Sequence, residues 1–222
     1  MSYILNIESS TTNCSISLSL NGELIFLKEK NDEKYSHSTN LHSFIKESLK
    51  ESHVSITKLS AIAVSKGPGS YTGLRIGVSA AKGLCYALDI PLISVSTLLV
   101  LAKQIKLNES GLIVPVLDAR RDEVYSAVFD SNFNMVRKVN PEIIEENSFD
   151  KYIPENKLFF IGNGQKKCER LIKKNSNLIF SSNNTFPSAK EMAFLSYQKF
   201  NSSVFEDIAY FEPDYLKEFI SG

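Results

Sequence analysis

Apolar residues fall into short runs in the opening part of the chain, and a turn signal separates two of them. Residues 3–8 form an apolar run typical of a buried strand. Runs at 14–20 and 23–30 follow, joined by Asn21-Gly22, a dipeptide that two-residue hairpin turns favour. The pattern predicts three consecutive antiparallel strands, with the polar loop of residues 9–13 leaving the end of the first.

The next stretch alternates between helical and strand patterns. Leu41, Phe44, Ile45 and Leu49 recur at helical spacing, which predicts an amphipathic helix over residues 38–52. Apolar runs predict strands at 61–65 and 90–95, and helices are expected at 72–88 and 97–106.

A second region begins near residue 108. Strands are expected at 112–117, 123–129 and 158–161, another strand after the turn at 131–134, and helices at 165–174 and 188–200. Residues 141–154 are acidic and poorly periodic, so we expect an irregular connection there. Helices and strands mixed in this way predict an α/β fold in two lobes, residues 1–107 and 108–222.

The composition indicates the cellular location of the protein more clearly than its catalytic or binding activity. The 222 residues carry 25 Lys and Arg against 25 Asp and Glu, so no overall basic field draws the chain to nucleic acid. Cys14 and Cys85 stand in apolar segments, where buried free thiols are expected. Residues 1–8 lack the basic start of a signal peptide, and polar residues interrupt the longest apolar stretch, 90–102. We therefore expect a cytoplasmic protein with no membrane span.

The most informative motif is the glycine-dense segment at residues 66–77, between a predicted strand and a predicted helix. Gly67, Gly69 and Gly73 allow backbone conformations and close approaches that a Cβ would block. The helix that follows presents unpaired N–H groups, so this loop, which includes Ser70, could hold a phosphate or accept another backbone closely. The spacing fits neither the Gly-x-Gly-x-x-Gly nor the Walker pattern, so neither nucleotide fingerprint applies. A generic glycine-rich turn is the alternative interpretation.

Polar residues at strand ends are further candidates. Glu8, Ser10 and Thr11 follow the first strand, and Asp118 follows the strand at 112–117, where α/β folds often place ligand sites. Alternatively, Glu8 caps its own loop by accepting N–H groups, and Asp118 belongs to a charged hairpin turn.

The predicted helix at 72–88 combines small residues with apolar ones. Gly77, Ala80 and Ala81 make part of its surface small, and Leu84 is among the larger apolar residues. The helix is either an ordinary core helix, or one face packs inside while another docks a partner or a second copy. The amphipathic helix at 38–52 would be its neighbour.

Other charged or ligating residues give weaker signals. His37 and His42 would lie about 140° apart on a helix, since each residue turns roughly 100°, and no metal site is expected. A basic run follows residue 165 and could touch RNA phosphate, although a solvated helix face is the simpler interpretation. The run consists of Lys166, Lys167, Arg170, Lys173 and Lys174.

Several motifs together resemble the TsaB family, also called YeaZ. The segment at residues 4–11, ILNIESST, looks like the opening strand and loop of actin/Hsp70/sugar-kinase-type folds. The closer matches are GPGSYTGLRIG at 67–77, AKGL at 81–84, IPL at 90–92, and DARR at 118–121 followed by EVY at 123–125. The closing PDYL at 213–216 also fits, whereas the second half otherwise matches loosely.

The resemblance implies a two-lobed actin/Hsp70/sugar-kinase-like (ASKHA) fold with a reduced second lobe, and a function through partners. The family's small subunit is expected to bind the catalytic paralogue, TsaD, with the ATPase TsaE joining the pair. Their complex moves a threonylcarbamoyl group to adenosine 37 of tRNA. The metal-binding histidines of the catalytic paralogue fall on Thr97 and Leu101 here, and neither residue can ligate iron or zinc.

The resemblance therefore implies a non-catalytic subunit that binds no cofactor tightly, with ATP and metal on the partner subunits and tRNA reached only through the complex. The helix faces expected to bind the partner comprise Leu41, Phe44, Ile45, Arg75, Gly77, Ala80, Ala81 and Leu84. A vestigial nucleotide or phosphate loop would comprise Glu8, Ser10, Thr11, Gly67, Gly69, Ser70, Gly73 and Asp118. Glu8 departs from the aspartate usual in the family.

Two other functions compete with this hypothesis. The chain could be an active nucleotide hydrolase or phosphotransferase that uses Glu8 and the glycine segment, which would require Mg²⁺-dependent turnover by the isolated chain. A peptidase function is the other alternative, but the sequence shows no nucleophile–base pair that would support it. An inactive homodimer is compatible with the partner hypothesis, because an apolar patch that awaits its partner can pair with itself.

Overall fold

The computed structural model describes residues 1–32, 37–107, 109–181 and 185–217. The chain divides into two compact units. The first comprises Met1–Val100 and Pro187–Tyr215, and the second comprises Leu101–Phe186 and Leu216–Gly222. No helix in the described residues is long and apolar enough to cross a membrane.

The first unit is built on a five-stranded mixed sheet in the order β3-β2-β1-β4-β5. Its strands are β1 (Tyr3–Glu8), β2 (Asn13–Leu20), β3 (Glu23–Asn31), β4 (Leu59–Ser65) and β5 (Leu92–Val95). The pairs β1/β2 and β2/β3 are antiparallel, which confirms the predicted opening meander. The pairs β1/β4 and β4/β5 are parallel, so two helical connections return the chain to the sheet.

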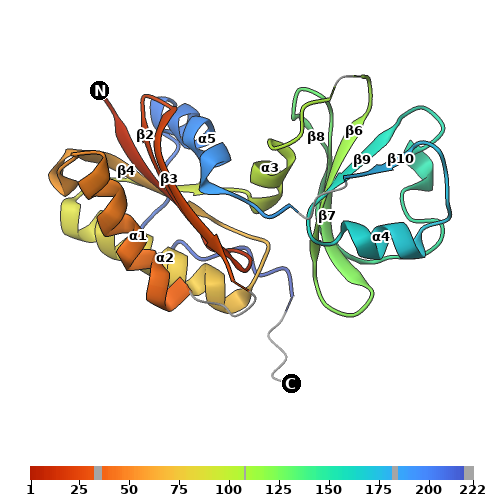
Figure 1. Ribbon diagram of the computed structural model, residues 1–222, viewed down its shortest axis with the longest axis horizontal. Helices are drawn as coiled ribbons and strands as arrows, with labels where there is room; N and C mark the ends of the chain where they lie inside the picture. The colour runs from red at the N-terminus through yellow and green to blue at the C-terminus, as the bar shows by residue number, and fades with distance from the viewer. Residues whose placement is uncertain (33–36, 108, 182–184, 218–222) are drawn as a thin grey trace. The chain divides into compact units, whose positions relative to one another are not determined.

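Helices cover both faces of this sheet (Figure 1). On one face, α1 (His37–Glu51) and α2 (Tyr71–Leu88) lie side by side and pack on β2 and β4. Their shared core includes Leu5, Ile7 and Ile62. On the other face, α5 (Ala189–Asn201) packs over alternate strand residues such as Ile4 and Ala63. Successive side chains of a strand point to opposite faces of the sheet, so strand residues contribute to the core on both faces.

The second unit holds another five-stranded mixed sheet in the order β10-β9-β6-β7-β8. Its strands are β6 (Leu112–Asp118), β7 (Glu123–Phe129), β8 (Met135–Ile143), β9 (Leu158–Ile161) and β10 (Leu178–Phe180). The helix α4 (Gln165–Leu171) covers this sheet, and Cys168 joins its core. Short elements complete the chain: α3 (Thr97–Ala102), η1 (Ile56–Lys58) and η2 (Asp150–Tyr152).

Several boundaries differ from the sequence prediction. The helix α3 ends at Ala102 instead of residue 106, and α4 ends at Leu171 instead of 174. After α4 the chain turns to an extended conformation at Ile172, which places that side chain in the core. The prediction of an irregular connection from residue 141 was wrong at its start, because β8 continues to Ile143. Proline is tolerated there because β8 is an edge strand.

Two further features lay outside the sequence prediction. The strand β10 was not expected, since Leu178–Phe180 is only three residues long. The helix α5 contacts β1, β2 and β5 and belongs to the first unit, whereas the expected division at residue 108 groups it with the second region. A linear division cannot represent a chain that returns to its first sheet near its end.

Candidate functional site

The glycine segment leads from β4 into α2 and is held against the loop that follows β1. Ser70 is the N-cap of α2, and its Oγ accepts a hydrogen bond from the Gly73 N–H at 3.2 Å. The Ser70 N–H in turn donates to the Ser10 carbonyl at 2.6 Å. These bonds fix the start of the helix against residues 9–11.

The glycines make this contact possible. A Cβ added to Gly69 would lie 2.3 Å from the Ser10 carbonyl oxygen, and one added to Gly73 would lie 2.2 Å from the Ser9 carbonyl oxygen. At Gly77 a Cβ would lie 2.2 Å from Ser9 Oγ. Close approach of another backbone accounts for Gly69 and Gly73, and Gly77 makes room for the Ser9 side chain. A phosphate-binding role of the loop stays a prediction.

The chain's closing segment packs on the same loop. Gly67 has a φ of +109°, in the left-handed region that favours glycine, and a Cβ there would lie 3.1 Å from the Asp214 carbonyl oxygen. The Asp214 N–H donates to the Lys66 carbonyl at 2.7 Å, and the two side chains form an ion pair at 3.0 Å. Asp214 of the PDYL motif thus packs against Lys66 and Gly67, at the start of the glycine segment.

Glu8 is fully buried at the end of β1. Its Oε1 accepts the Ser10 N–H at 2.7 Å, and its Oε2 is buried without a hydrogen-bond partner among the described residues. Burial raises the pKa of Glu8 above its ordinary value of 4.5, and the hydrogen bonds from Ser10 offset only part of that effect. The geometry matches the capping interpretation of Glu8.

Thr11 anchors the start of α1. The His37 Nε2 lies 2.6 Å from the Thr11 carbonyl oxygen, so this nitrogen carries the proton and donates it. Burial lowers the pKa of His37, and the bond to Thr11 opposes that shift. His37 is therefore a buried neutral residue that ties α1 to the loop after β1.

Asp118 belongs to the second unit and is exposed at the end of β6. Its Oδ1 accepts the Arg120 N–H at 2.7 Å and the Lys167 Nζ at 2.9 Å. The charged-turn interpretation of Asp118 describes this arrangement.

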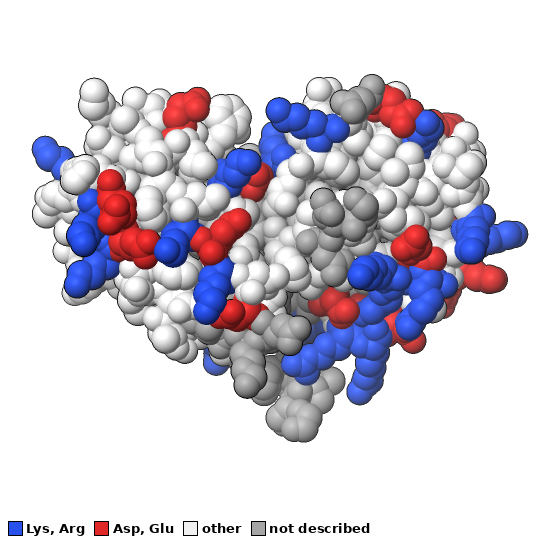
Figure 2. Space-filling view, viewed as in Figure 1, with Lys and Arg blue, Asp and Glu red and all other residues white. Residues whose placement is uncertain are grey.

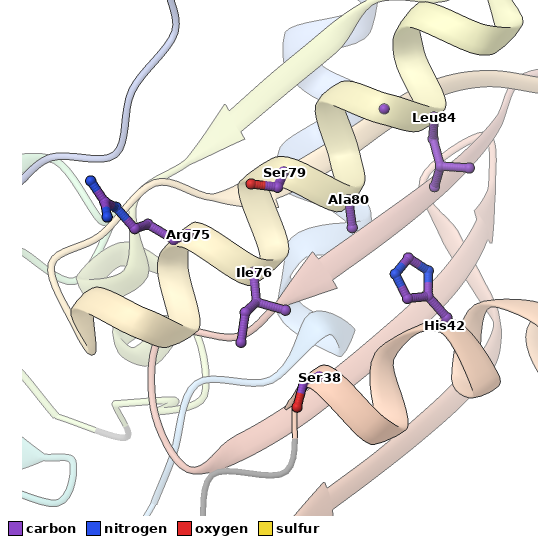
Figure 3. Close-up of a pocket in the computed structure, with 8 residues that line it drawn as sticks. Ser38, His42, Arg75, Ile76, Ser79, Ala80 and Leu84 are labelled. Atoms are coloured by element: carbon purple, nitrogen blue, oxygen red, sulfur yellow. The ribbon is translucent and has the colours of Figure 1, made fainter.

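An open groove of about 590 Å³ runs between α1 and α2. Ile76, Ala80 and Leu84 point from α2 toward α1, and His42 points back from α1 (Figure 3). The full lining comprises Ser38, His42, Arg75, Ile76, Ser79, Ala80, Gly83 and Leu84. The groove thus has an apolar floor and a rim of polar side chains.

The expected docking residues divide between this groove and the core. Arg75, Ala80 and Leu84 line the groove. The remaining five are buried within the unit, namely Leu41, Phe44, Ile45, Gly77 and Ala81. Their burial corrects the expectation that they lie on the docking surface: the apolar stripe of α1 faces its own sheet, and Gly77 faces Ser9.

Sequence reasoning missed Ser38, His42, Ile76, Ser79 and Gly83 as groove residues. Their spacing carried the signal. Ser38 and His42 are four residues apart on α1, and on α2 the lining residues recur in pairs every four residues. The groove residues of α1 lie on the flank of its apolar stripe, so the stripe alone does not reveal them.

Arg75 is held at one end of the groove by two aromatic rings. Its guanidinium lies 4.3 Å from the centroid of the Tyr71 ring, and its Nε donates to the Tyr215 hydroxyl at 3.3 Å. The two rings are 4.9 Å apart. Since Tyr215 follows Asp214, the closing segment that covers the glycine loop also orients a groove residue.

The three cysteines are free and buried, as expected for Cys14 and Cys85. Burial raises the pKa of Cys14 to about 11 and that of Cys85 to about 12. Burial likewise raises the pKa of Cys168 to about 12. A thiol with so high a pKa is a poor nucleophile at neutral pH.

Comparison with known proteins places the chain in a family. Residues 32–219 match the family model described as "TsaD: tRNA N6-adenosine threonylcarbamoyltransferase". A Buchnera aphidicola protein named "tRNA threonylcarbamoyladenosine biosynthesis protein TsaB" is 33% identical over 84% of this chain and 85% of its own length. A Bacillus subtilis protein with the same name is 30% identical over 96% of this chain and 93% of its own.

The chain belongs to the TsaB (YeaZ) family. The solved structure titled "YeaZ from Pseudomonas aeruginosa" matches with a TM-score of 0.84 at 24% identity, over 97% of this chain and all of that one. Together with the two mixed sheets, this match confirms the expected α/β fold in two lobes. Thr97 and Leu101, which stand in place of the catalytic paralogue's expected histidines, are both buried.

Proposed function

We propose that this chain is the non-catalytic subunit of a tRNA N6-adenosine threonylcarbamoyltransferase and that it binds a TsaD-type catalytic paralogue through the α1–α2 groove. A TsaE-type ATPase would join the pair, and tRNA would be modified by the whole complex. The names of the relatives support a role in threonylcarbamoyladenosine formation. The family match to the TsaD model supports a paralogue as the partner, because related chains often pair through equivalent helices.

The observation that carries the proposal is the open groove itself. Its floor of Ile76, Ala80 and Leu84 is only partly buried in this chain, and small residues on α2 let a partner helix approach closely. Tyr86, which is 84% exposed, continues the same side of α2 beyond Gly83. Exposed tyrosine beside an apolar groove is typical of protein interfaces.

The residues that would form a nucleotide or metal site have features that favour a non-catalytic role. The glycines after β4 accommodate Ser9 and Ser10, and Glu8 is buried with a raised pKa. Thr97 and Leu101 offer no imidazole to a metal. Catalysis, ATP and metal would therefore belong to the partner subunits.

A bulky charge in the groove tests this role. Ala80→Arg places a long cation among the apolar floor residues and should lower the affinity for the TsaD-type protein of the same organism by about 100-fold or more, because buried interface charges cost several kcal/mol. Isothermal titration calorimetry measures the affinity, and modified adenosine formed by the reconstituted proteins measures the function.

The matched control is Ser131→Arg, in an exposed turn of the second unit. It adds the same side chain away from the groove and should leave affinity and modification unchanged. Ala81 is unsuitable for the test because it is fully buried, so an arginine there would disrupt folding. Normal pairing by a folded Ala80→Arg variant, or Mg²⁺-dependent nucleotide turnover by the isolated chain, would contradict the proposal.

A further inference from the structure

The second unit gathers basic residues that are far apart in the sequence. The helix α4 is tied to the β6–β7 turn by Lys167, whose Nζ contacts Asp118 at 2.9 Å and the Glu123 carbonyl at 2.8 Å. Arg170 contacts Asp122 in the same turn at 2.9 Å. The basic run of α4 therefore continues into the arginines at the tip of the turn.

The backbone of that turn is unusual. Arg120 has a φ of +69° and Arg121 a φ of +49°, so two consecutive arginines occupy the left-handed region. Hairpin turns with such angles favour Asn-Gly, because a residue with a Cβ is strained at a left-handed position. Strained conformations of this kind cluster at functional sites, where the surrounding structure holds them. Here the Asp118 carboxylate holds the Arg120 N–H at 2.7 Å.

Many of these cations lack a neutralising partner. Five exposed side chains have no carboxylate of a described residue within ion-pair distance, and we call them the basic surface: Arg120, Arg121, Lys166, Lys173 and Lys174. The nearby carboxylates of Asp118, Asp122 and Glu123 are already paired with Lys167, Arg170 and Lys217.

The neighbourhood of the basic surface is itself crowded with positive charge. Partial burial lowers the pKa of Lys217, and the charge of Arg121 lowers it further. Figure 2 shows blue atoms gathering in the part of the second unit where Figure 1 draws α4. Since the whole chain has a formal net charge of zero, this concentration is local.

We propose that the basic surface binds the phosphate backbone of an RNA. Arginine forks pair bidentately with phosphate, and lysines placed around them add the sequence-independent attraction that backbone binding needs. The strained turn presents two neighbouring guanidinium groups, and a ligand with successive phosphates could contact both of them. The choice of tRNA as that RNA rests on the proposed function. The contact would be a direct one by this chain, in addition to contacts made by its partners.

The turn chemistry provides a variant that removes charge without harming the fold. Arg120→Asn/Arg121→Gly supplies the residues that left-handed hairpin positions favour, so the protein should be at least as stable. Binding of an unmodified tRNA transcript is measured by fluorescence anisotropy, with the chain alone and in its complex. We expect the double variant to bind about tenfold more weakly, and the slope of log K against log salt to shrink by about two.

Lys58→Gln/Lys138→Gln removes two exposed charges elsewhere and should bind as the wild type does. Lys166→Gln/Lys173→Gln independently tests the part of the surface that lies on α4 and directly after it, and should weaken binding likewise. Equal tRNA affinity of the wild type and both basic-surface variants, or no binding by the wild type, would overturn the proposal. So would displacement of the RNA by stoichiometric ATP, which would indicate a nucleotide site.

RNA binding by the basic surface can be tested separately from partner binding by the α1–α2 groove. The Arg120→Asn/Arg121→Gly variant should still pair with the TsaD-type protein, whereas Ala80→Arg should lose the partner and keep the RNA affinity of the isolated chain. Loss of both properties in either variant would contradict the assignment of two surfaces.

Discussion

Glu8 is a fully buried carboxyl whose surroundings disfavour its ionisation. It ends β1, accepts one N–H from Ser10, and has no described partner for its second oxygen. Because burial favours the neutral acid, its pKa is raised. A carboxyl in this state caps a loop.

The buried acid predicts a pH dependence of stability. The unfolded chain releases the Glu8 proton near pH 4.5, whereas the native chain keeps it to a higher pH. The native state then binds more protons than the unfolded state, so the free energy of unfolding falls as the pH rises above 4.5. Glu8→Gln removes this contribution, and its stability relative to the wild type should increase from pH 4.5 to pH 7.

Urea unfolding of both proteins at several pH values provides the comparison. Other titrating groups, such as His37, act in both proteins and cancel in the difference. A stability difference that stays constant across this pH range would show that Glu8 ionises normally in the folded chain.

The helix α2 is the element that connects the first unit's internal packing with its surface. Gly73 and Gly77 face Ser9, and the Ser9 Oγ donates to the Gly73 carbonyl at 2.9 Å. Gly83 lies on the exposed side, where a Cβ would meet nothing within 4 Å. Glycines of one helix thus serve two different purposes.

This difference predicts opposite effects of the same substitution. Gly73→Ala would place a methyl group 2.2 Å from the Ser9 carbonyl oxygen and should destabilise the chain by about 1–3 kcal/mol. Gly83→Ala replaces an exposed helical glycine and should stabilise it by up to about 1 kcal/mol. Urea unfolding measures both. Stabilisation by Gly73→Ala would contradict the close contact between α2 and the loop after β1.

The sequence was sufficient where the signal was local. The Asn21-Gly22 hairpin, the strand β4 and the helix α2 follow from turn chemistry and periodicity. The sequence did not predict which faces of α1 and α2 are buried within the unit, because periodicity identifies an apolar stripe without saying whether a sheet or a partner covers it. Leu41 and Phe44 were therefore assigned to docking although they fill the core. The pairing of Asp118 with Lys167 spans 49 residues and has no local signal.

At the scale of the whole molecule, the two units carry different surfaces. The first unit presents the apolar α1–α2 groove, with Arg75 held at its end by Tyr71 and Tyr215. The second presents the basic surface around Arg120 and Arg121. Both surfaces suit contacts with other macromolecules, as the proposed function requires.

The central claim is that the groove holds a TsaD-type subunit, and light scattering after size exclusion tests it most directly. The chain and the TsaD-type protein of the same organism are run separately and then mixed in equal amounts. We predict a one-to-one complex that replaces any homodimer of this chain. Two unchanged masses in the mixture, with both proteins folded by circular dichroism, would contradict the claim.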